Sequence, residues 1–337
     1  MTRDQTITQF LDRAGWHDAD RRPLADDASF RRYDRVTLGE RRAVLMDAPP
    51  DKEDVRPFLR VARHLTGLGL SAPEIFAEEA DHGLLLLEDL GDDTYTRLLA
   101  RGGDEEALYA LAVDLLIALH RHAPTESLFD GLPPYDDETL MTEALLLPDW
   151  YSAAQQGTAP SDSLRDSYRK AWMKVLPRVR LQPDTLVLRD YHVDNLLQLP
   201  DRDGVAACGL LDFQDALAGP PAYDVMSLLE DARRDIAPDL KQRMLNRYGA
   251  AFPALDRAAF ETAFTILAAQ RHAKVIGIFT RLCVRDGKPV YLSHIPRVWR
   301  LLEAALEHPA LAPVAQWVDT HIPPSQRGIP PCPHATP

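Results

Sequence analysis

Two short apolar strands flank a polar loop in residues 185–199, TLVLRDYHVDNLLQL. Asp190 follows the first apolar run and Asn195 directly precedes the second, so both side chains belong to a loop that is held at its two ends. A further apolar strand at 208–211 runs into Asp212, and Gly-Pro-Pro at 219–221 ends the loop after it. Each of the three polar side chains therefore lies where a strand gives way to a loop.

Asp190, Asn195 and Asp212 are the residue types that phosphoryl transfer requires. One carboxylate accepts the proton of the acceptor hydroxyl, while a carboxamide and a second carboxylate hold Mg²⁺ against the nucleotide phosphates. Protein kinases supply these groups as Asp-x-x-x-x-Asn followed by Asp-Phe-Gly, and this chain repeats the spacing, with Asp-Phe-Gln at 212–214. Asp and Asn are also ordinary turn formers. Three such elements in this order favour a kinase site using ATP and Mg²⁺, with Asp190 catalytic and Asn195 and Asp212 as metal ligands.

This set of motifs resembles the aminoglycoside phosphotransferase and choline kinase superfamily, a branch of the protein-kinase-like fold. The resemblance implies an α+β protein with a small β-rich N-lobe (1–90, with a hinge near 86–91) and a larger, mostly helical C-lobe (91–325). The superfamily loop usually opens with His-Gly, where this chain has Leu188 and Arg189. His192 and Asp224, the latter in a Pro-Ala-Tyr-Asp run that also matches the family pattern, are expected to support the loop structurally.

Length and charge limit the remaining possibilities. A chain of 337 residues can form two lobes with separate cores. Its net charge of −13 argues against a general nucleic-acid or membrane binder, although a local basic cluster with Mg²⁺ can still hold phosphates.

The cysteines and the two chain ends bear on the compartment. Cys208, Cys283 and Cys332 are odd in number and have no metal-ligand spacing, which predicts reduced thiols. The first ten residues lack the apolar core of a signal peptide, and no apolar run reaches membrane-spanning length. We therefore expect a cytoplasmic protein, with a proline-rich, disordered tail at 326–337.

After an opening helix over 7–14, residues 26–50 predict two strands joined by a hairpin at 38–40. In a kinase-like fold these strands cover the nucleotide phosphates, so the nucleotide contacts are expected at Ser29, Phe30, Arg31 and Arg32. Met46 stands where such kinases carry a phosphate-binding lysine. The two arginines are candidates for the missing charge, or they are solvated edge-strand charges that limit aggregation.

Residues 83–89, GLLLLED, predict a buried strand that runs into a turn. In the kinase-like interpretation this is the hinge, where backbone groups of Glu88, Asp89 and Leu90 hydrogen-bond adenine. A plain core strand ending in a turn fits the same residues.

Two motifs in the helical C-lobe allow more than one interpretation. A helix over 108–119 ends in His120 and His122, which suits interaction with the helix dipole better than a metal site. A helix over 136–147 is followed by Trp150 and Tyr151. This aromatic pair fits core packing, or a sugar-binding face beside Glu143.

Further helices are predicted over 223–234, 238–251 and 257–283. Along the last of these, four cations share one helical face, namely Arg271, Lys274, Arg281 and Arg285. This stripe is a candidate docking surface for an anionic substrate group. The alternative is a set of surface ion pairs.

Several segments resemble, more narrowly, the bacterial kinases of cell-wall recycling that phosphorylate the C1 hydroxyl of N-acetylmuramate and N-acetylglucosamine. They are residues 27–33, 45–50, 147–151, 211–216, 270–289 and 291–298. The resemblance implies a small amino-sugar substrate, with Arg271 and Lys274 suited to the lactyl carboxylate of N-acetylmuramate.

Two other functions remain open at this point. One is an aminoglycoside- or choline-type phosphotransferase, since the acidic chain could form an acidic acceptor groove. The other is a nucleotide-binding pseudokinase with a regulatory role, which Met46 favours and which the intact Asp190, Asn195 and Asp212 oppose.

Overall fold

The computed structural model describes residues 2–26, 30–180 and 182–332. It divides into two compact units, the first made of Met1–Leu119 and Val193–Ala216 and the second of His120–His192 and Leu217–Pro337. The first unit is larger than the expected lobe of residues 1–90. It takes in a later hairpin because Ser71 donates a hydrogen bond of 2.6 Å to the carbonyl oxygen of Ala206 and forms a bridge with Gly209.

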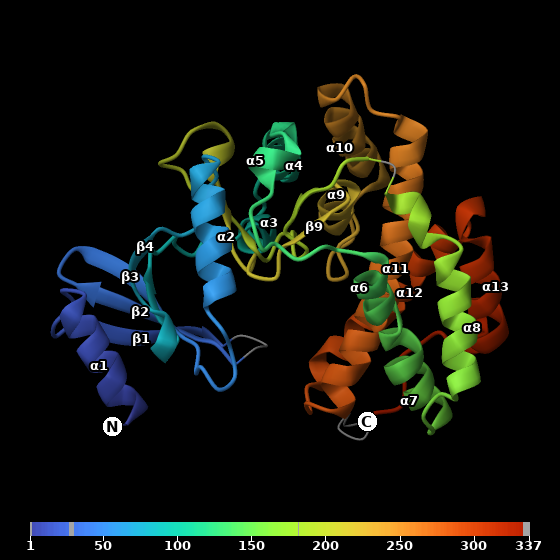
Figure 1. The fold of residues 1–337 in the computed structure, drawn as a ribbon, viewed down its shortest axis with the longest axis horizontal. Helices are drawn as coiled ribbons and strands as arrows, with labels where there is room; N and C mark the ends of the chain where they lie inside the picture. Colours follow the sequence, from blue (N-terminus) through green and yellow to red (C-terminus); the bar gives the residue numbers. More distant parts are fainter. Residues whose placement is uncertain (1, 27–29, 181, 333–337) are drawn as a thin grey trace. The chain divides into compact units, whose positions relative to one another are not determined.

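A five-stranded antiparallel sheet forms the centre of the first unit, with the strand order β1-β2-β3-β5-β4 (Figure 1). The strands are β1 (Asp20–Asp26), β2 (Arg32–Leu38), β3 (Arg41–Asp47), β4 (Ile75–Glu79) and β5 (Leu84–Leu87). The two strands expected within residues 26–50 are β2 and β3, and Gly39 in the turn between them has a φ of 62°.

Helix α1 (Arg3–Arg13) covers one face of this sheet, after a capping box formed by Thr2 and Gln5. Its apolar stripe includes Phe10 and packs in one core cluster with Leu45 of β3. Successive side chains of a strand point to opposite faces. Val44 and Met46, on either side of Leu45, therefore face away from α1.

The rest of the first unit is mostly helical. Helix α2 (Arg56–Gly67) buries an apolar face that includes Phe58, whose ring stacks on Phe213 at 5.0 Å between centroids. The remaining elements are α3 (Tyr95–Ala100), most of α4 (Glu105–Arg121), and the hairpin of β7 (Leu196–Gln198) and β8 (Cys208–Leu210).

The second unit is built around one long helix, α11 (Arg257–Val284), most of whose residues are buried (Figure 1). A small antiparallel pair, β6 (Thr185–Val187) and β9 (Leu217–Gly219), leads into the loop that carries Asp190. The other helices are α5 (Pro124–Ser127), α6 (Asp137–Ala144), α7 (Ala153–Gln156), α8 (Asp162–Met173), α9 (Ala222–Leu229), α10 (Pro238–Ala251), α12 (Ile295–Leu306) and α13 (Ala312–His321).

Short helical turns join these longer elements. They are a π-helical turn at Leu147–Ser152 and 3₁₀ turns at Ala80–His82, Leu176–Val179, Gly204–Ala207, Pro289–His294, Pro309–Leu311 and Pro324–Gln326. The π-helical turn follows α6 directly and contains Pro148, which cannot continue the α-helical hydrogen-bond ladder.

The C-terminal segment is ordered as far as residue 332, so the prediction of a disordered tail is wrong for residues 326–332. Arg327 forms ion pairs with Glu303 (2.9 Å) and Asp319 (2.5 Å). Cys332 forms a disulfide with Cys283, and only Cys208 is a free cysteine among the described residues. The expectation of reduced thiols is therefore corrected for this pair. Residues 333–337 lie outside the described part of the chain.

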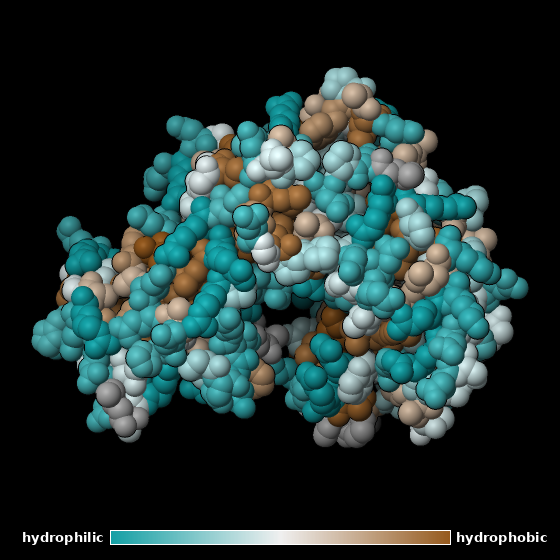
Figure 2. Space-filling view, viewed as in Figure 1, coloured by the Kyte–Doolittle hydropathy of each residue, from teal (hydrophilic) through white to brown (hydrophobic). Residues whose placement is uncertain are grey.

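The face shown in Figure 2 is mostly hydrophilic over both units. Large exposed hydrophobic side chains are scattered over the described residues, at Phe30, Phe76, Met173, Leu211, Val290 and Ile329. Within residues 2–26, 30–180 and 182–332, no helix combines the length and the apolar character that a membrane crossing demands.

Candidate active site

The β7–β8 hairpin brings Asn195 and Asp212 together in the first unit. Because Leu196 pairs with Leu210 in an antiparallel register, the residue before β7 and the residues after β8 lie at the same end of the hairpin. The amide of Leu211 donates a hydrogen bond of 3.0 Å to the carbonyl oxygen of Asn195. The side-chain amide of Asn195 lies 3.5 Å from Oδ2 of Asp212.

Asp212 has a strained backbone, with a φ of 57°. A left-handed conformation costs a residue other than glycine about 1–3 kcal/mol and is common at functional sites. The other described non-glycine residues with positive φ are Asp18 and Arg189. Two of these three lie in the stretch that the sequence predicts to be catalytic.

The carboxylate of Asp212 is also surrounded by donors. Its Oδ1 accepts from Nε2 of Gln214 at 2.8 Å and from Nη2 of Arg31 at 3.3 Å. The side chain keeps 38% of its exposure, so it still faces open space. Mg²⁺ prefers oxygen ligands and keeps one or two carboxylates together with phosphate and water oxygens. The carboxylate of Asp212 and the amide oxygen of Asn195 fit that requirement.

A cavity of about 420 Å³ adjoins this pair within the first unit. Its lining is mostly apolar and contains the three expected hinge residues and both expected metal ligands. Among the lining residues are Tyr33, Val44, Phe58, Leu87, Glu88, Asp89, Leu90, Asn195, Leu197, Leu211 and Asp212. Arg35 holds the carboxylate of Asp89 at 2.7 Å, and Arg202 pairs with Glu88. The acidic side chains of the hinge are thus engaged by arginines, and the cavity is suited to a flat apolar ring.

The four residues expected in the loop over the phosphates have different environments. Ser29 lies outside the described residues, Phe30 is 64% exposed, and Arg32 is exposed. The side chain of Arg31 is only 10% exposed and is the one that reaches Asp212. Met46 is buried, and as a methionine it brings no charge to the position of the usual lysine.

Asp190 lies in the second unit, on the loop after β6, and Asp224 supports that loop. Asp224 is fully buried at the start of α9 and accepts hydrogen bonds from the backbone amides of Leu188 (2.6 Å) and Arg189 (2.9 Å). Burial raises the pKa of Asp224 to about 7. These two hydrogen bonds hold the backbone of the loop directly before Asp190. His192 is 5% exposed, and burial lowers its pKa.

The side chain of Asp190 is 36% exposed and lies 3.4 Å from Nη2 of Arg271. Desolvation raises the pKa of Asp190, but the positive charges of Arg271, Lys274 and Arg189 outweigh it and hold the pKa below its usual range. Asp190 is therefore an anion at neutral pH. It can accept a hydrogen bond from a hydroxyl group.

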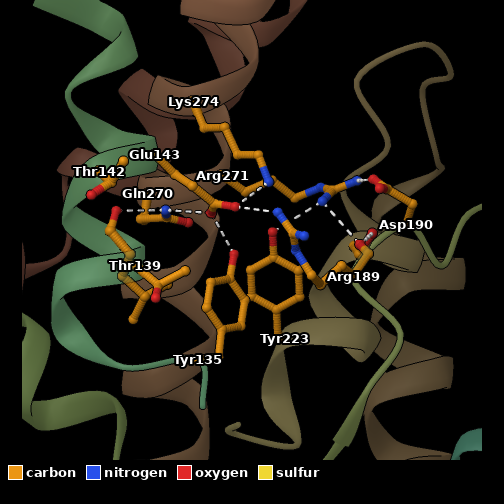
Figure 3. Close-up of polar contacts among 12 residues, drawn as sticks. Tyr135, Thr139, Thr142, Glu143, Arg189, Asp190, Tyr223, Gln270, Arg271 and Lys274 are labelled. Atoms are coloured by element: carbon orange, nitrogen blue, oxygen red, sulfur yellow. Dashed lines mark hydrogen bonds and ion pairs between the residues drawn. The ribbon is translucent and has the colours of Figure 1, made fainter. Parts of the chain in front are cut away.

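Glu143 lies at the centre of a buried polar network between α6 and α11 (Figure 3). Its Oε1 accepts from Lys274 (2.7 Å) and from Arg189, and its Oε2 accepts from Tyr135 (2.5 Å) and Gln270 (3.1 Å). Desolvation raises the pKa of Glu143, but Lys274 and Arg189 outweigh it and lower the pKa to about 2. Since both oxygens are engaged by protein donors, Glu143 orients cations, whereas we expected it to contact a substrate.

The expected cationic stripe is not a surface feature. Arg271 and Lys274 are each only 7% exposed, because this part of α11 is enclosed by neighbouring helices. Arg281 is half-buried, and Arg285 pairs with Asp286 at 2.6 Å beyond the end of the helix. The interpretation as a surface stripe is corrected: Arg271 lies 3.4 Å from Asp190, and Lys274 pairs with Glu143.

The aromatic pair after α6 does not form an exposed face. Tyr151 is fully buried, packs against Trp299, and donates a hydrogen bond of 2.5 Å to the carbonyl oxygen of Gln326. The prediction that Tyr151 binds substrate is therefore wrong, and Trp150 is half-buried.

At the end of α4, Nδ1 of His120 lies 2.8 Å from the hydroxyl of Tyr248.

Four residues of the site were not predicted from the sequence. Arg189 was noted only as a departure from the superfamily loop. Tyr223 lies in the Pro-Ala-Tyr-Asp run and Gln270 begins the segment 270–289, but neither was assigned a role, and Tyr135 lies in no quoted motif. Tyr223 accepts a hydrogen bond from Arg271, and Tyr135 and Gln270 both donate to Glu143. The available signals were these two matching segments and the cation at a position where the superfamily usually has glycine.

The first unit carries a carboxylate and a carboxamide beside an apolar cavity, and the second carries a further carboxylate on a buttressed loop. These are the residue types that phosphotransferases of the protein-kinase-like fold use. The chain belongs to the phosphotransferase enzyme family, whose model matches residues 20–260. Solved structures support the fold. An ADP-bound aminoglycoside phosphotransferase is 17% identical, with a TM-score of 0.57 over 90% of this chain and 98% of its own. A choline kinase from Streptococcus pneumoniae is 11% identical, with a TM-score of 0.60 over 92% of this chain and 98% of its own.

Curated relatives are more similar in sequence. A protein from Caulobacter vibrioides is 37% identical, with 95% of this chain and 97% of the relative covered. One from Pseudomonas aeruginosa is 39% identical, with 93% of each chain covered. Both bear the name N-acetylmuramate/N-acetylglucosamine kinase.

Proposed function

We propose that this protein is a cytoplasmic, ATP-dependent sugar kinase that phosphorylates the C1 hydroxyl of N-acetylmuramate and N-acetylglucosamine. The similarity to the two relatives carries the proposal, because it extends over nearly the whole of each chain. Similarity confined to the kinase motifs would support a nucleotide site alone. Here it also includes α11 and the acceptor side of the second unit.

In this proposal the first unit binds the nucleotide. Adenine lies in the cavity of about 420 Å³, against the backbone of Glu88, Asp89 and Leu90. Asn195 and Asp212 hold Mg²⁺, which neutralises charge on the phosphates. Arg31 approaches the phosphates from the side of Asp212, in place of the lysine that Met46 replaces.

The second unit binds the sugar and supplies Asp190. Its carboxylate accepts a hydrogen bond from the C1 hydroxyl, orients that oxygen for attack on the γ-phosphorus, and takes the proton as the bond to ADP breaks. Arg271 holds Asp190 in place and keeps it ionised. Because the transition state is loose, orientation by Asp190 contributes more than its basicity.

An assay of ADP release with four acceptors tests the function. We expect Mg²⁺-dependent turnover with N-acetylmuramate and N-acetylglucosamine, and at most background with choline and an aminoglycoside. Turnover with choline or the aminoglycoside alone would assign a different phosphotransferase. Nucleotide binding without turnover on any acceptor would indicate a pseudokinase.

Replacing Arg31 by alanine should raise the KM for ATP by about ten- to a hundredfold, the usual effect of losing a charge-assisted hydrogen bond. The double variant R31A/M46K should recover part of that loss. Residue 46 lies on the same side of β3 as Val44, which lines the nucleotide cavity, so a lysine there points the same way. Steady-state kinetics with varied ATP provide the measurement.

Arg32 is the matched control, because it is adjacent in the chain but exposed. R32A should change the KM for ATP by less than about threefold, as expected of a surface charge. Equal effects of R31A and R32A, or no recovery in the double variant, would remove Arg31 from the phosphate site.

A further inference from the structure

The last described residues of the chain, 322–332, form a segment that we call the C-terminal strap. It passes over the π-helical turn after α6, where the hydroxyl of Tyr151 donates to the carbonyl oxygen of Gln326 at 2.5 Å. The amide of Gly328 donates to the same hydroxyl at 2.9 Å. From α7, Nε2 of Gln155 donates to the carbonyl oxygen of Gln326 at 2.8 Å. The backbone of the strap is therefore attached to a part of the second unit that lies far earlier in the chain.

Arg327 attaches the middle of the strap to two further helices. Its side chain is 8% exposed and pairs with Glu303 of α12 at 2.9 Å and with Asp319 of α13 at 2.5 Å. Its guanidinium also lies 5.6 Å from the ring centroid of Trp299. The side chains of both acidic partners are largely exposed, at 41% and 68%, and exposed ion pairs contribute little to stability. The non-covalent attachment of the strap is therefore modest.

A disulfide fixes the end of the strap. Cys332 is bonded to Cys283 in the last turn of α11, with the two α-carbons 6.4 Å apart. The sequence separation is 49 residues, and closing a long loop restricts the unfolded chain more than closing a short one. Cys283 is fully buried, whereas Cys332 is half-buried. A small thiol therefore reaches the bond more readily from the side of Cys332.

The bond differs from what the sequence predicts. Three cysteines without metal-ligand spacing are typical of reduced thiols. The thiol pool of the cytoplasm, which we propose as the location of this protein, keeps cysteines reduced, and the disulfides found there are usually transient or redox-sensing. A bond that forms and breaks with the state of that pool accounts for both the sequence and the structure.

We propose that the disulfide between Cys283 and Cys332 is a redox-sensitive clamp, which holds the C-terminal strap when oxidised and releases it when reduced. This inference uses the proposed location and does not depend on the proposed reaction. The thiolate of a monothiol of the glutathione class attacks Sγ of Cys332, the S–S bond breaks, and Cys283 leaves as a thiolate that takes up a proton. A second monothiol displaces Cys332 from the mixed disulfide in the same way. Two electrons pass to the protein, which gains two thiols, and the reductant becomes a disulfide.

Trypsin reports on the strap, because it cleaves after Arg327, whose side chain is held by ion pairs while the clamp is closed. The full chain is kept in oxidised glutathione or in an excess of reduced glutathione, and cleavage is followed by mass spectrometry. Cleavage after Arg101 is the internal reference. Arg101 lies exposed in a turn of the first unit and, like Arg327, precedes a glycine. The mass added by N-ethylmaleimide gives the number of free thiols.

We expect reduction to speed cleavage after Arg327 by at least about tenfold in the wild type, because the strap then opens more often, and to leave cleavage after Arg101 unchanged. C208S is the matched control, since Cys208 lies in the first unit and takes no part in the disulfide, and it should respond as the wild type does. C283S and C332S should be cleaved fast with either form of glutathione. C332S changes only a half-buried side chain, so it keeps the test valid if C283S does not fold.

The inference fails if the bond persists in the folded protein under millimolar reduced glutathione, because it would then be a static structural link. It also fails if both cysteines stay as thiols in oxidised glutathione. Full reduction without faster cleavage after Arg327 would likewise overturn it, since the ion pairs and the contacts of Tyr151 would hold the strap by themselves. Each of these outcomes is read without turnover, so a failure of the proposed function is seen separately.

Discussion

Replacing Asp190 by asparagine should lower kcat by about 10²–10⁴-fold, the usual contribution of a positioned proton acceptor. Asparagine keeps the size of the side chain and can still accept the hydrogen bond from Arg271. It loses the negative charge that orients and deprotonates the sugar hydroxyl. Because asparagine has no carboxyl group to ionise, raising the pH should not restore activity to the variant. Steady-state kinetics at several pH values provide the measurement.

Two controls make the result specific. Affinity for ADP, measured by calorimetry, should stay within about threefold of wild type, because Asp190 belongs to the second unit and the nucleotide cavity to the first. D184N changes an aspartate just before β6 that is 38% exposed, and it should leave kcat near wild type. A D190N protein with wild-type turnover would remove Asp190 from the reaction.

Replacing Asp212 by asparagine should lower kcat/KM for ATP by more than about a hundredfold. Loss of a residue that only orients a metal ligand lowers metal affinity or activity by about 10–100-fold. Loss of a charged direct ligand should therefore lower them by at least as much. Asparagine tolerates positive φ as aspartate does, so the φ of 57° adds no new strain. Activity measured against Mg²⁺ concentration should show a higher half-saturation point in the variant.

D201N is the matched control in the same unit, because Asp201 lies exposed in the loop after β7. Its Mg²⁺ dependence should equal that of wild type. If D212N lost activity without any change in its Mg²⁺ dependence, Asp212 would be a structural residue and the proposed metal site would be wrong.

The sequence predicted those parts of the fold that depend on local pattern. Helix α10 (Pro238–Ala251) begins and ends at the expected residues, because proline suits the first turn of a helix. The strands around Asp190, Asn195 and Asp212 were expected from their short apolar runs and are present as β6, β7 and β8. Asn195 and Asp212 lie side by side because the register of their hairpin requires it.

Elements without a local pattern were not predicted. Strand β1 (Asp20–Asp26) contains a proline and charged residues. This composition suits an edge strand but lacks the apolar pattern by which a strand is predicted. Helix α9 ends at Leu229, five residues before the expected end at residue 234. The packing of the segment 326–332 over Tyr151 joins residues 175 positions apart, which no local pattern encodes.

The candidate site shows the same division. Asp190 could be proposed because the motif spacing is present in the sequence. Glu143 was assigned to substrate binding because the sequence does not show which side chains contact it. Lys274 and Arg189 neutralise Glu143 from two other elements, and only the three-dimensional arrangement shows it. Sequence spacing thus suggests which side chains to propose for the chemistry, and long-range packing determines which of them are accessible.

The position of the phosphate on the product tests the central claim most directly. After incubation with ATP, Mg²⁺ and N-acetylglucosamine or N-acetylmuramate, phosphorus–proton correlation NMR identifies the carbon that bears the new phosphate. We predict coupling of the new phosphorus signal to the anomeric proton at C1 with both sugars. A phosphate on any other hydroxyl, or ADP release without a sugar phosphate, would contradict the account.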